Sequence, residues 1–183
     1  RVHGGRRTGV TVFSNSGPLM ALAKLGQLEL LSQLFGQVHL PTAVYREVVI
    51  RGKQRGYPDA QQVQMAIHRQ QLRVVGVAVT DLPSDITTLS LDPGEKEAIY
   101  LAQSEADSLV LLDDWKAREE AKARGLKARG TLGVIVQGYR ANLINFDEVE
   151  ALFEGIISHD QIWIAEGLCR QVLGRLQVER QSP

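Results

Sequence analysis

The sequence is poor in the features that mark secreted, membrane-bound or broadly basic proteins. Its single cysteine, Cys169, cannot form an internal disulfide, which fits a reducing cytoplasm. No apolar run approaches the length of a membrane span. Lys plus Arg and Asp plus Glu both number 21, so the formal net charge of zero excludes a basic coat over the whole surface, although not a local basic patch. We therefore expect a cytoplasmic protein without a membrane segment.

The order of apolar runs indicates the fold class. Strands are expected at 11–13, 38–40, 72–75 and 109–112, with a short edge strand at 126–128. Helical periodicity separates them, and two further helices are expected at 146–157 and 162–176. Strands that alternate with helices predict an α/β fold with a central, mostly parallel sheet and helices on both faces. Polar residues 51–59 predict a loop, and residues 80–91 predict an irregular segment.

Acidic residues follow this pattern at one edge of the predicted sheet. The apolar run at 109–112 ends on Asp113 and Asp114, and Asn15 follows the first strand. Glu47 and Glu95 lie in first turns of helices that begin at the same edge, where open α/β sheets place their ligands. Such a cluster of oxygen ligands can hold Mg²⁺ or Mn²⁺, and an ion of this kind polarises a phosphodiester.

Each of these residues also has a purely structural explanation. One of Asp113 and Asp114 can cap the helix that follows them. Asp92 and Glu95 fit a capping box, in which Glu95 reaches back to the Asp92 amide. Glu47 can lie on a solvent-facing flank, and Asn15 can be a plain turn residue. Basic residues after the acidic pair suit a solvated helix face.

Five motifs in order make the sequence similar to a known family. They are SNSGPLMALAKLG (14–26), LPTAVYREV (40–48), DPGEKEAI (92–99), LLDDWKAR (111–118) and GTLG (130–133). Together they resemble the PIN-domain superfamily, in particular a VapC-like prokaryotic branch. The resemblance covers residues 10–145 and implies a three-layer α/β/α fold and a metal-dependent ribonuclease. It also implies that dimers are common and that many members are toxins of toxin–antitoxin pairs.

The resemblance also implies a set of site residues. The metal ligands would be Asn15, Glu47, Glu95 and Asp113, and Glu47, Glu95, Asp113 and Asp114 would be catalytic. Ser16 and Thr131 match hydroxyl residues that support the site, and Arg118, one turn beyond Asp114, can pair with an acid or a phosphate. Asn15 departs from the family pattern, which has Asp there. An amide oxygen still ligates a hard cation, but one unit of attraction is lost.

Three hypotheses follow for the function. The first is a Mg²⁺- or Mn²⁺-dependent nuclease for single-stranded RNA. The second, motivated by Asn15, is a catalytically impaired PIN-like module that binds RNA or a protein. A third, a small-ligand or nucleotide-binding α/β protein, is weak because neither G-x-G-x-x-G nor a P-loop is present.

We expect three parts of the chain. They are a flexible basic leader (1–9), a PIN-like domain (10–145) and a C-terminal helical extension of that domain (146–183). The late helices carry the apolar residues Phe153, Trp163, Ile164 and Leu168. These either pack on their own domain or form a surface for a homodimer or an antitoxin.

Overall fold

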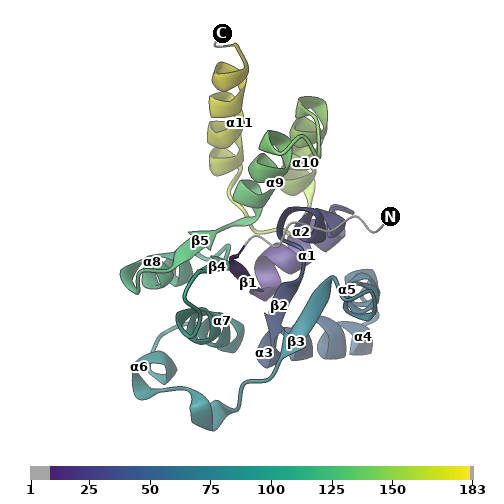
Figure 1. Cartoon of the computed structure of the whole chain (residues 1–183). Coiled ribbons are helices and arrows are strands. Elements are labelled where there is room, and N and C mark those ends of the chain that lie inside the picture. The colour runs from purple at the N-terminus through teal and green to yellow at the C-terminus, as the bar shows by residue number, and fades with distance from the viewer. Residues whose placement is uncertain (1–8, 182–183) are drawn as a thin grey trace, which may run out of the picture. The chain divides into compact units, whose positions relative to one another are not determined.

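The computed structural model describes residues 9–181 (Figure 1). The expected leader therefore lies outside the described residues except for Gly9. The chain divides into two compact units, of which the first ends at Thr131 and the second begins at Leu132. The expected change from a domain to a helical extension after residue 145 stays a prediction.

A five-stranded parallel sheet forms the centre of the first unit. Its strands are β1 (Thr11–Ser14), β2 (Val38–Pro41), β3 (Leu72–Val75), β4 (Ser108–Leu111) and β5 (Lys127–Arg129). Their order across the sheet is β3-β2-β1-β4-β5, and each neighbouring pair is parallel. This confirms the predicted α/β fold, including the short strand at the sheet edge.

Helices fill every connection between the strands (Figure 1). The β1–β2 connection holds α1 (Ser16–Lys24) and α2 (Glu29–Phe35), and the β2–β3 connection holds α3 (Thr42–Tyr45), η1 (Arg46–Arg51), α4 (Gly52–Gln54) and α5 (Pro58–His68). The β3–β4 connection holds η2 (Val79–Asp81), α6 (Ser84–Thr87) and α7 (Pro93–Gln103), and α8 (Trp115–Ala123) joins β4 to β5. Right-handed crossovers place α1, α2 and α5 on one face of the sheet and α7 and α8 on the other.

The core on the α7–α8 face explains how these helices sit close to the sheet. Phe13, Val110 and Leu112 point from β1 and the β4 end into a cluster that contains small residues of both helices. The alanines of that cluster, Ala98, Ala102, Ala117 and Ala121, are fully buried. Because alanine side chains are short, α7 and α8 can pack directly against the strands and hold their first turns at the carboxyl edge.

The predicted loop at 51–59 is wrong over part of its length. Arg51 closes η1, a π-helix, and α4 continues the helical path from Gly52 to Gln54. The chain turns only at Gly56, whose φ is +70°, and Pro58 then opens α5. Gly52 lets α4 approach α5, because a Cβ there would lie 2.9 Å from the Cβ of Ala60.

The structure also differs from the expectations for residues 80–91 and for the start of the last helix. The irregular segment at 80–91 contains the short helical turns η2 and α6. Ile86 of α6 is fully buried, so this segment is anchored in the α7–α8 core rather than free. The last helix begins at Glu166 instead of residue 162, since residues 162–165 are not helical.

The second unit is helical. It contains most of α9 (Thr131–Arg140), together with α10 (Phe146–Ser158) and α11 (Glu166–Gln181). A capping box of Asn145 and Glu148 opens α10. The ring of Phe146 packs edge-on against that of Tyr139, with 5.9 Å between the ring centroids. Phe153 is buried, whereas the side chain of Trp163 is 91% exposed. Within residues 9–181, no helix is long and apolar enough to cross a membrane.

Candidate functional site

The predicted site residues gather at the carboxyl edge of β1 and β4, the two central strands that pair with each other. The pairing ends at Ser14 and Leu111, and the backbone N–H of Asn15 still donates to the carbonyl of Leu111 at 3.0 Å. The chain moves from β1 to β2 on one side and later to β4 on the other, so the strand order reverses here. In open α/β sheets, this reversal leaves a crevice in which ligands bind.

Asn15 and Glu95 meet across this crevice. The side-chain amide of Asn15 donates to Oε1 of Glu95 at 3.4 Å, and the hydroxyl of Ser16 donates to Oδ1 of Asn15 at 3.4 Å. Both Asn15 and Glu95 are buried, at 7% and 5% exposure. Asn15 at the end of β1 and Glu95 in α7 are therefore in contact, and Ser16 adds a hydrogen bond to Asn15.

Glu95 has both a structural role and an unusual electrostatic setting. Its Oε2 accepts a hydrogen bond from the backbone N–H of Asp92 at 3.0 Å, as the capping box predicted. Burial raises the pKa of Glu95, the Asp92 hydrogen bond opposes the rise, and the charges of Asp114, Asp92 and Glu47 raise it further. Three carboxylates thus act on Glu95 at this edge, which is the repulsion expected of a site suited to a cation.

Asp113 is held by the start of α9. Its Oδ1 accepts from the backbone N–H of Thr131 at 2.7 Å, and its Oδ2 accepts from the Thr131 hydroxyl at 2.6 Å. Burial raises the pKa of Asp113, whereas the two Thr131 hydrogen bonds and the charge of Arg118 oppose the rise. Each carboxylate oxygen of Asp113 keeps a free lone pair, so Thr131 orients Asp113 and leaves it able to accept another ligand.

Asp114 is the helix cap of the acidic pair. Its Oδ1 accepts from the backbone N–H of Ala117 at 2.9 Å, at the N-terminus of α8. The expected pairing of Arg118 with an acid or a phosphate stays a prediction, because its hydrogen bonds in the structure go to the backbone. Its Nη1 instead donates to the carbonyls of Asp113 at 2.7 Å and Leu112 at 3.3 Å. Arg118 therefore fixes the backbone on which the acidic pair stands.

Glu47 is exposed on η1, and it forms no side-chain hydrogen bond or ion pair within the described part of the chain. Its position depends on a residue that the sequence analysis missed. Glu97, which is buried in α7, accepts a hydrogen bond at Oε2 from the backbone N–H of Ala43 at 2.8 Å. Glu97 thereby binds the first turn of α3 to α7 and holds the helix that carries Glu47 beside the helix that carries Glu95.

Glycines make room for this close packing. A Cβ on Gly94 would lie 2.7 Å from Oδ1 of Asn15 and 2.9 Å from Cγ2 of Val44. A Cβ on Gly130 would lie 2.9 Å from Oδ1 of Asp113. Gly94 and Gly130 are thus required by the lack of space around Asn15 and Asp113.

A polar hollow of about 360 Å³ opens beside the acidic residues. Its lining consists of Ser90, Leu91, Asp92, Glu95, Asp114 and Lys116. Asp92 and Lys116 were assigned only cap and surface roles from the sequence, and the structure places both in the hollow. It is an open surface that suits a polar, extended ligand rather than a small enclosed one.

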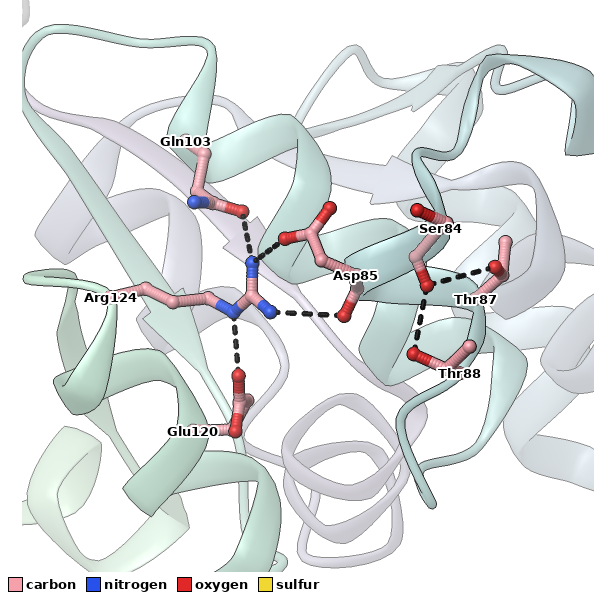
Figure 2. Close-up of polar contacts among 7 residues, drawn as sticks. All are labelled: Ser84, Asp85, Thr87, Thr88, Gln103, Glu120 and Arg124. Carbon is pink, nitrogen blue, oxygen red and sulfur yellow. Dashed lines mark hydrogen bonds and ion pairs between the residues drawn. The ribbon is translucent and has the colours of Figure 1, made fainter.

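Arg124 anchors the segment that leads to Ser90 and Leu91 of this hollow. Figure 2 shows the contacts of Arg124. From the C-terminal end of α8, its guanidinium donates to Oδ2 of Asp85 at 2.7 Å, to the Asp85 carbonyl at 3.1 Å and to Gln103 at 3.3 Å. Its Nε donates to Glu120, one helical turn earlier, at 2.6 Å. The hydrogen bond from Arg124 lowers the pKa of Asp85, and the positive charge of Arg124 lowers it further. Arg124 therefore joins α6 to α7 and α8.

The donor chemistry of the site fits a hard divalent cation, because carboxylate and amide oxygens are its preferred ligands. Over residues 9–181, however, no three His, Cys, Asp or Glu side chains converge closely enough to form a ready metal site. The side chains of Asn15, Glu95 and Asp113 are each held by protein hydrogen bonds instead. The structure thus brings the predicted ligands to one edge of the sheet, but their side chains do not converge on a common position for a cation.

The fold and the site together define a parallel α/β protein with an acidic crevice at its switch point, and the comparisons give its family. A family model described as a PIN domain matches residues 11–178, so the chain belongs to the PIN-domain family. PIN domains are generally nucleases and typically use divalent metals.

The other comparisons add little to this assignment. No curated protein matches the chain. Among solved structures, it is similar to a domain of a functionally unknown protein from Methanocaldococcus jannaschii DSM 2661, with 17% identity and a TM-score of 0.42. That match covers 66% of this chain and 90% of the archaeal chain.

Proposed function

We propose that this chain is a metal-dependent endoribonuclease that cleaves single-stranded RNA over the carboxyl edge of β1 and β4. The observation that carries the proposal is the setting of Glu95, whose pKa is raised by burial and by the charges of Asp114, Asp92 and Glu47. Carboxylates that repel one another at a ligand-binding edge favour a cation there. Membership of the PIN-domain family supports the same activity.

The residues divide the proposed task among them. Asn15, Glu47, Glu95 and Asp113 would hold Mg²⁺ or Mn²⁺, which when bound supplies Lewis-acid polarisation of the phosphodiester. Thr131 and Ser16 orient Asp113 and Asn15 through the hydrogen bonds described above. Lys116 on the lining of the hollow can contact a phosphate. The oxygens of Glu47 form no hydrogen bond with the described residues, so they are free to accept a proton from an attacking water.

The sharpest test replaces Glu47, because its side chain supports no other part of the described fold. Glu47→Gln should abolish Mn²⁺-dependent cleavage of a labelled single-stranded RNA while the thermal melt stays unchanged. Glu105→Gln is the matched control, since Glu105 is exposed and precedes β4 at the opposite edge of the sheet. Asp113→Asn should also abolish cleavage. Full cleavage by Glu47→Gln, or none by pure wild-type protein with varied RNAs, would contradict the proposal.

A second candidate function is a catalytically impaired PIN module that binds RNA or a protein. It is favoured by the Asn15 amide, which satisfies Glu95 with a hydrogen bond where an Asp would add charge. RNA binding without cleavage by the wild type, together with cleavage by Asn15→Asp, would select this candidate. Cleavage by the wild type would reject it.

The wider biological role belongs to the proposal as well. We propose a cytoplasmic location, which is supported by the single buried cysteine, and a toxin role in a toxin–antitoxin pair. A homodimer or an antitoxin contact through the second unit is supported by the exposure of Trp163 and Leu168. Light scattering of the wild type and of Trp163→Ser would test the dimer, which the substitution should weaken.

A further inference from the structure

A second hollow lies on α1, η1, α4 and α5, and it shares Glu47 with the proposed site. Its volume is about 150 Å³, well above the roughly 10–15 Å³ that one water needs. The residues that give it chemical character are Met20, Glu47, Arg51, Arg55, Tyr57 and Asp59. None of these except Glu47 belongs to the predicted catalytic set.

The charges around this hollow leave two arginines free. Asp59 is neutralised by an ion pair with Lys24, and both of these side chains are buried. Arg51 and Arg55 are exposed, and within residues 9–181 neither guanidinium forms a hydrogen bond or an ion pair. The two lie one helical turn apart, since the backbone N–H of Arg55 donates to the carbonyl of Arg51 at 3.1 Å. Two free guanidinium groups on one face suit a phosphate.

An aromatic side chain completes the hollow. Tyr57 precedes α5, is 37% exposed and donates its backbone N–H to the carbonyl of Gly52 at 2.9 Å. The contact of Gly52 with Ala60 leaves no space for a larger residue, so α4 and α5 hold Tyr57 and the two arginines in a fixed arrangement. Exposed aromatic rings next to cationic groups are the elements that stack and hold single-stranded nucleic acid.

We propose that this hollow binds one nucleotide of the single-stranded RNA substrate, next to the scissile position. Arg51 and Arg55 hold its phosphate, and the ring of Tyr57 with Met20 contacts its base. Glu47 lines this hollow, and its charge acts on Glu95 at the acidic edge, so a strand that crosses Glu47 joins this nucleotide to the phosphodiester at that edge. The inference rests on the proposed function, but it concerns binding and can be measured without cleavage.

The experiment measures binding of a short fluorescein-labelled oligouridylate by fluorescence polarisation in EDTA. Arg55→Glu should weaken binding roughly tenfold, whereas Lys53→Glu should weaken it about twofold or less. Lys53 is the matched control because it undergoes the same charge reversal on α4 but does not line the hollow. Arg55→Ala should lower the salt dependence by about 0.7 per lost phosphate contact. Tyr57→Leu should weaken binding roughly tenfold and leave the salt dependence unchanged.

The outcomes separate this inference from the nuclease. Equal weakening by Lys53→Glu and Arg55→Glu would overturn it, because net charge alone would then explain binding. Wild-type affinity in Arg55→Glu and Tyr57→Leu, or no binding by the wild type in EDTA, would overturn it as well. If the wild type never cleaves RNA but binds it, and Arg55→Glu and Tyr57→Leu weaken that binding, the inference is upheld and the nuclease is rejected. Circular dichroism of each variant checks that a loss of binding is not a loss of fold.

Discussion

The side-chain amide of Asn15 donates a hydrogen bond to the carboxylate of Glu95 at 3.4 Å. This contact joins the end of β1 to the first turn of α7 inside the acidic crevice. An amide can satisfy a carboxylate at this short range, whereas a second carboxylate would repel it. Asn15 therefore avoids this repulsion at the edge of the sheet.

Asn15→Asp should destabilise the metal-free protein and make it depend on a cation. The change removes the donor to Glu95 and adds a negative charge, so we expect a loss of about 1–3 kcal/mol in unfolding free energy in EDTA. Mn²⁺ should restore more stability to the variant than to the wild type. Asn145→Asp, at the helix cap of α10, is the control and should change little. Equal responses to Mn²⁺ would argue against a cation beside Asn15.

Gly94→Ala should destabilise the protein by about 1–3 kcal/mol. The new methyl group would lie within 3 Å of both Asn15 Oδ1 and Val44, which forces α7 away from the strand end and from α3. Gly174→Ala is the matched control in α11, where a methyl group would meet no described atom within 4 Å and should stabilise the helix slightly. Urea unfolding of both variants checks this, and an unchanged midpoint for Gly94→Ala would contradict it.

Arg124→Ala should loosen the segment from Ser84 to Leu91 without unfolding the sheet. The guanidinium provides the hydrogen bonds that tie Asp85 to α7 and α8 (Figure 2). Ser90 and Leu91, a few residues later in the chain, line the polar hollow. Hydrogen exchange of peptides covering 84–91 should become faster. Lys122→Ala removes an exposed ion pair with Glu119 on the same helix and should leave those peptides unchanged.

The stability of the metal-free protein should fall as the pH rises from about 4. The pKa values of Glu95 and Asp113 are raised in the folded chain, so the folded state holds protons more tightly than the unfolded state above the ordinary carboxyl pKa of about 4. The unfolding free energy therefore decreases through the raised pKa values and levels off above them. Glu95→Gln should show a smaller decrease in urea unfolding across pH 4–8. Parallel curves for variant and wild type would contradict it.

Local patterns in the sequence were enough to predict the scaffold of the site. The Asp92–Glu95 capping box and the cap role of Asp114 are encoded within a few residues, and both are present. The strand ends could be predicted because buried parallel strands form continuous apolar runs bounded by turn residues. These signals concern neighbours along the chain, which is why they placed Asn15 and Asp113 at the correct edge.

Contacts between distant segments could not be predicted in the same way. Glu97 binds the amide of Ala43, and Arg124 binds Asp85, yet nothing in the sequence near either residue specifies its partner. The π-helix η1 also lacks a periodic signal, so residues 51–54 were expected to be loop. Such features depend on how whole helices pack, and packing is decided by the shapes of surfaces that meet only in the folded chain.

The strand order has a consequence for the newly made chain. Asn15 follows β1, Asp113 follows β4, and Thr131, which orients Asp113, follows β5, the latest of the sheet strands in residues 9–181. Each parallel pairing must wait for its crossover, so the acidic edge forms only when the entire sheet is in place. Under the proposed function, a chain still emerging from the ribosome would therefore hold no assembled acidic edge with which to cut the RNA around it.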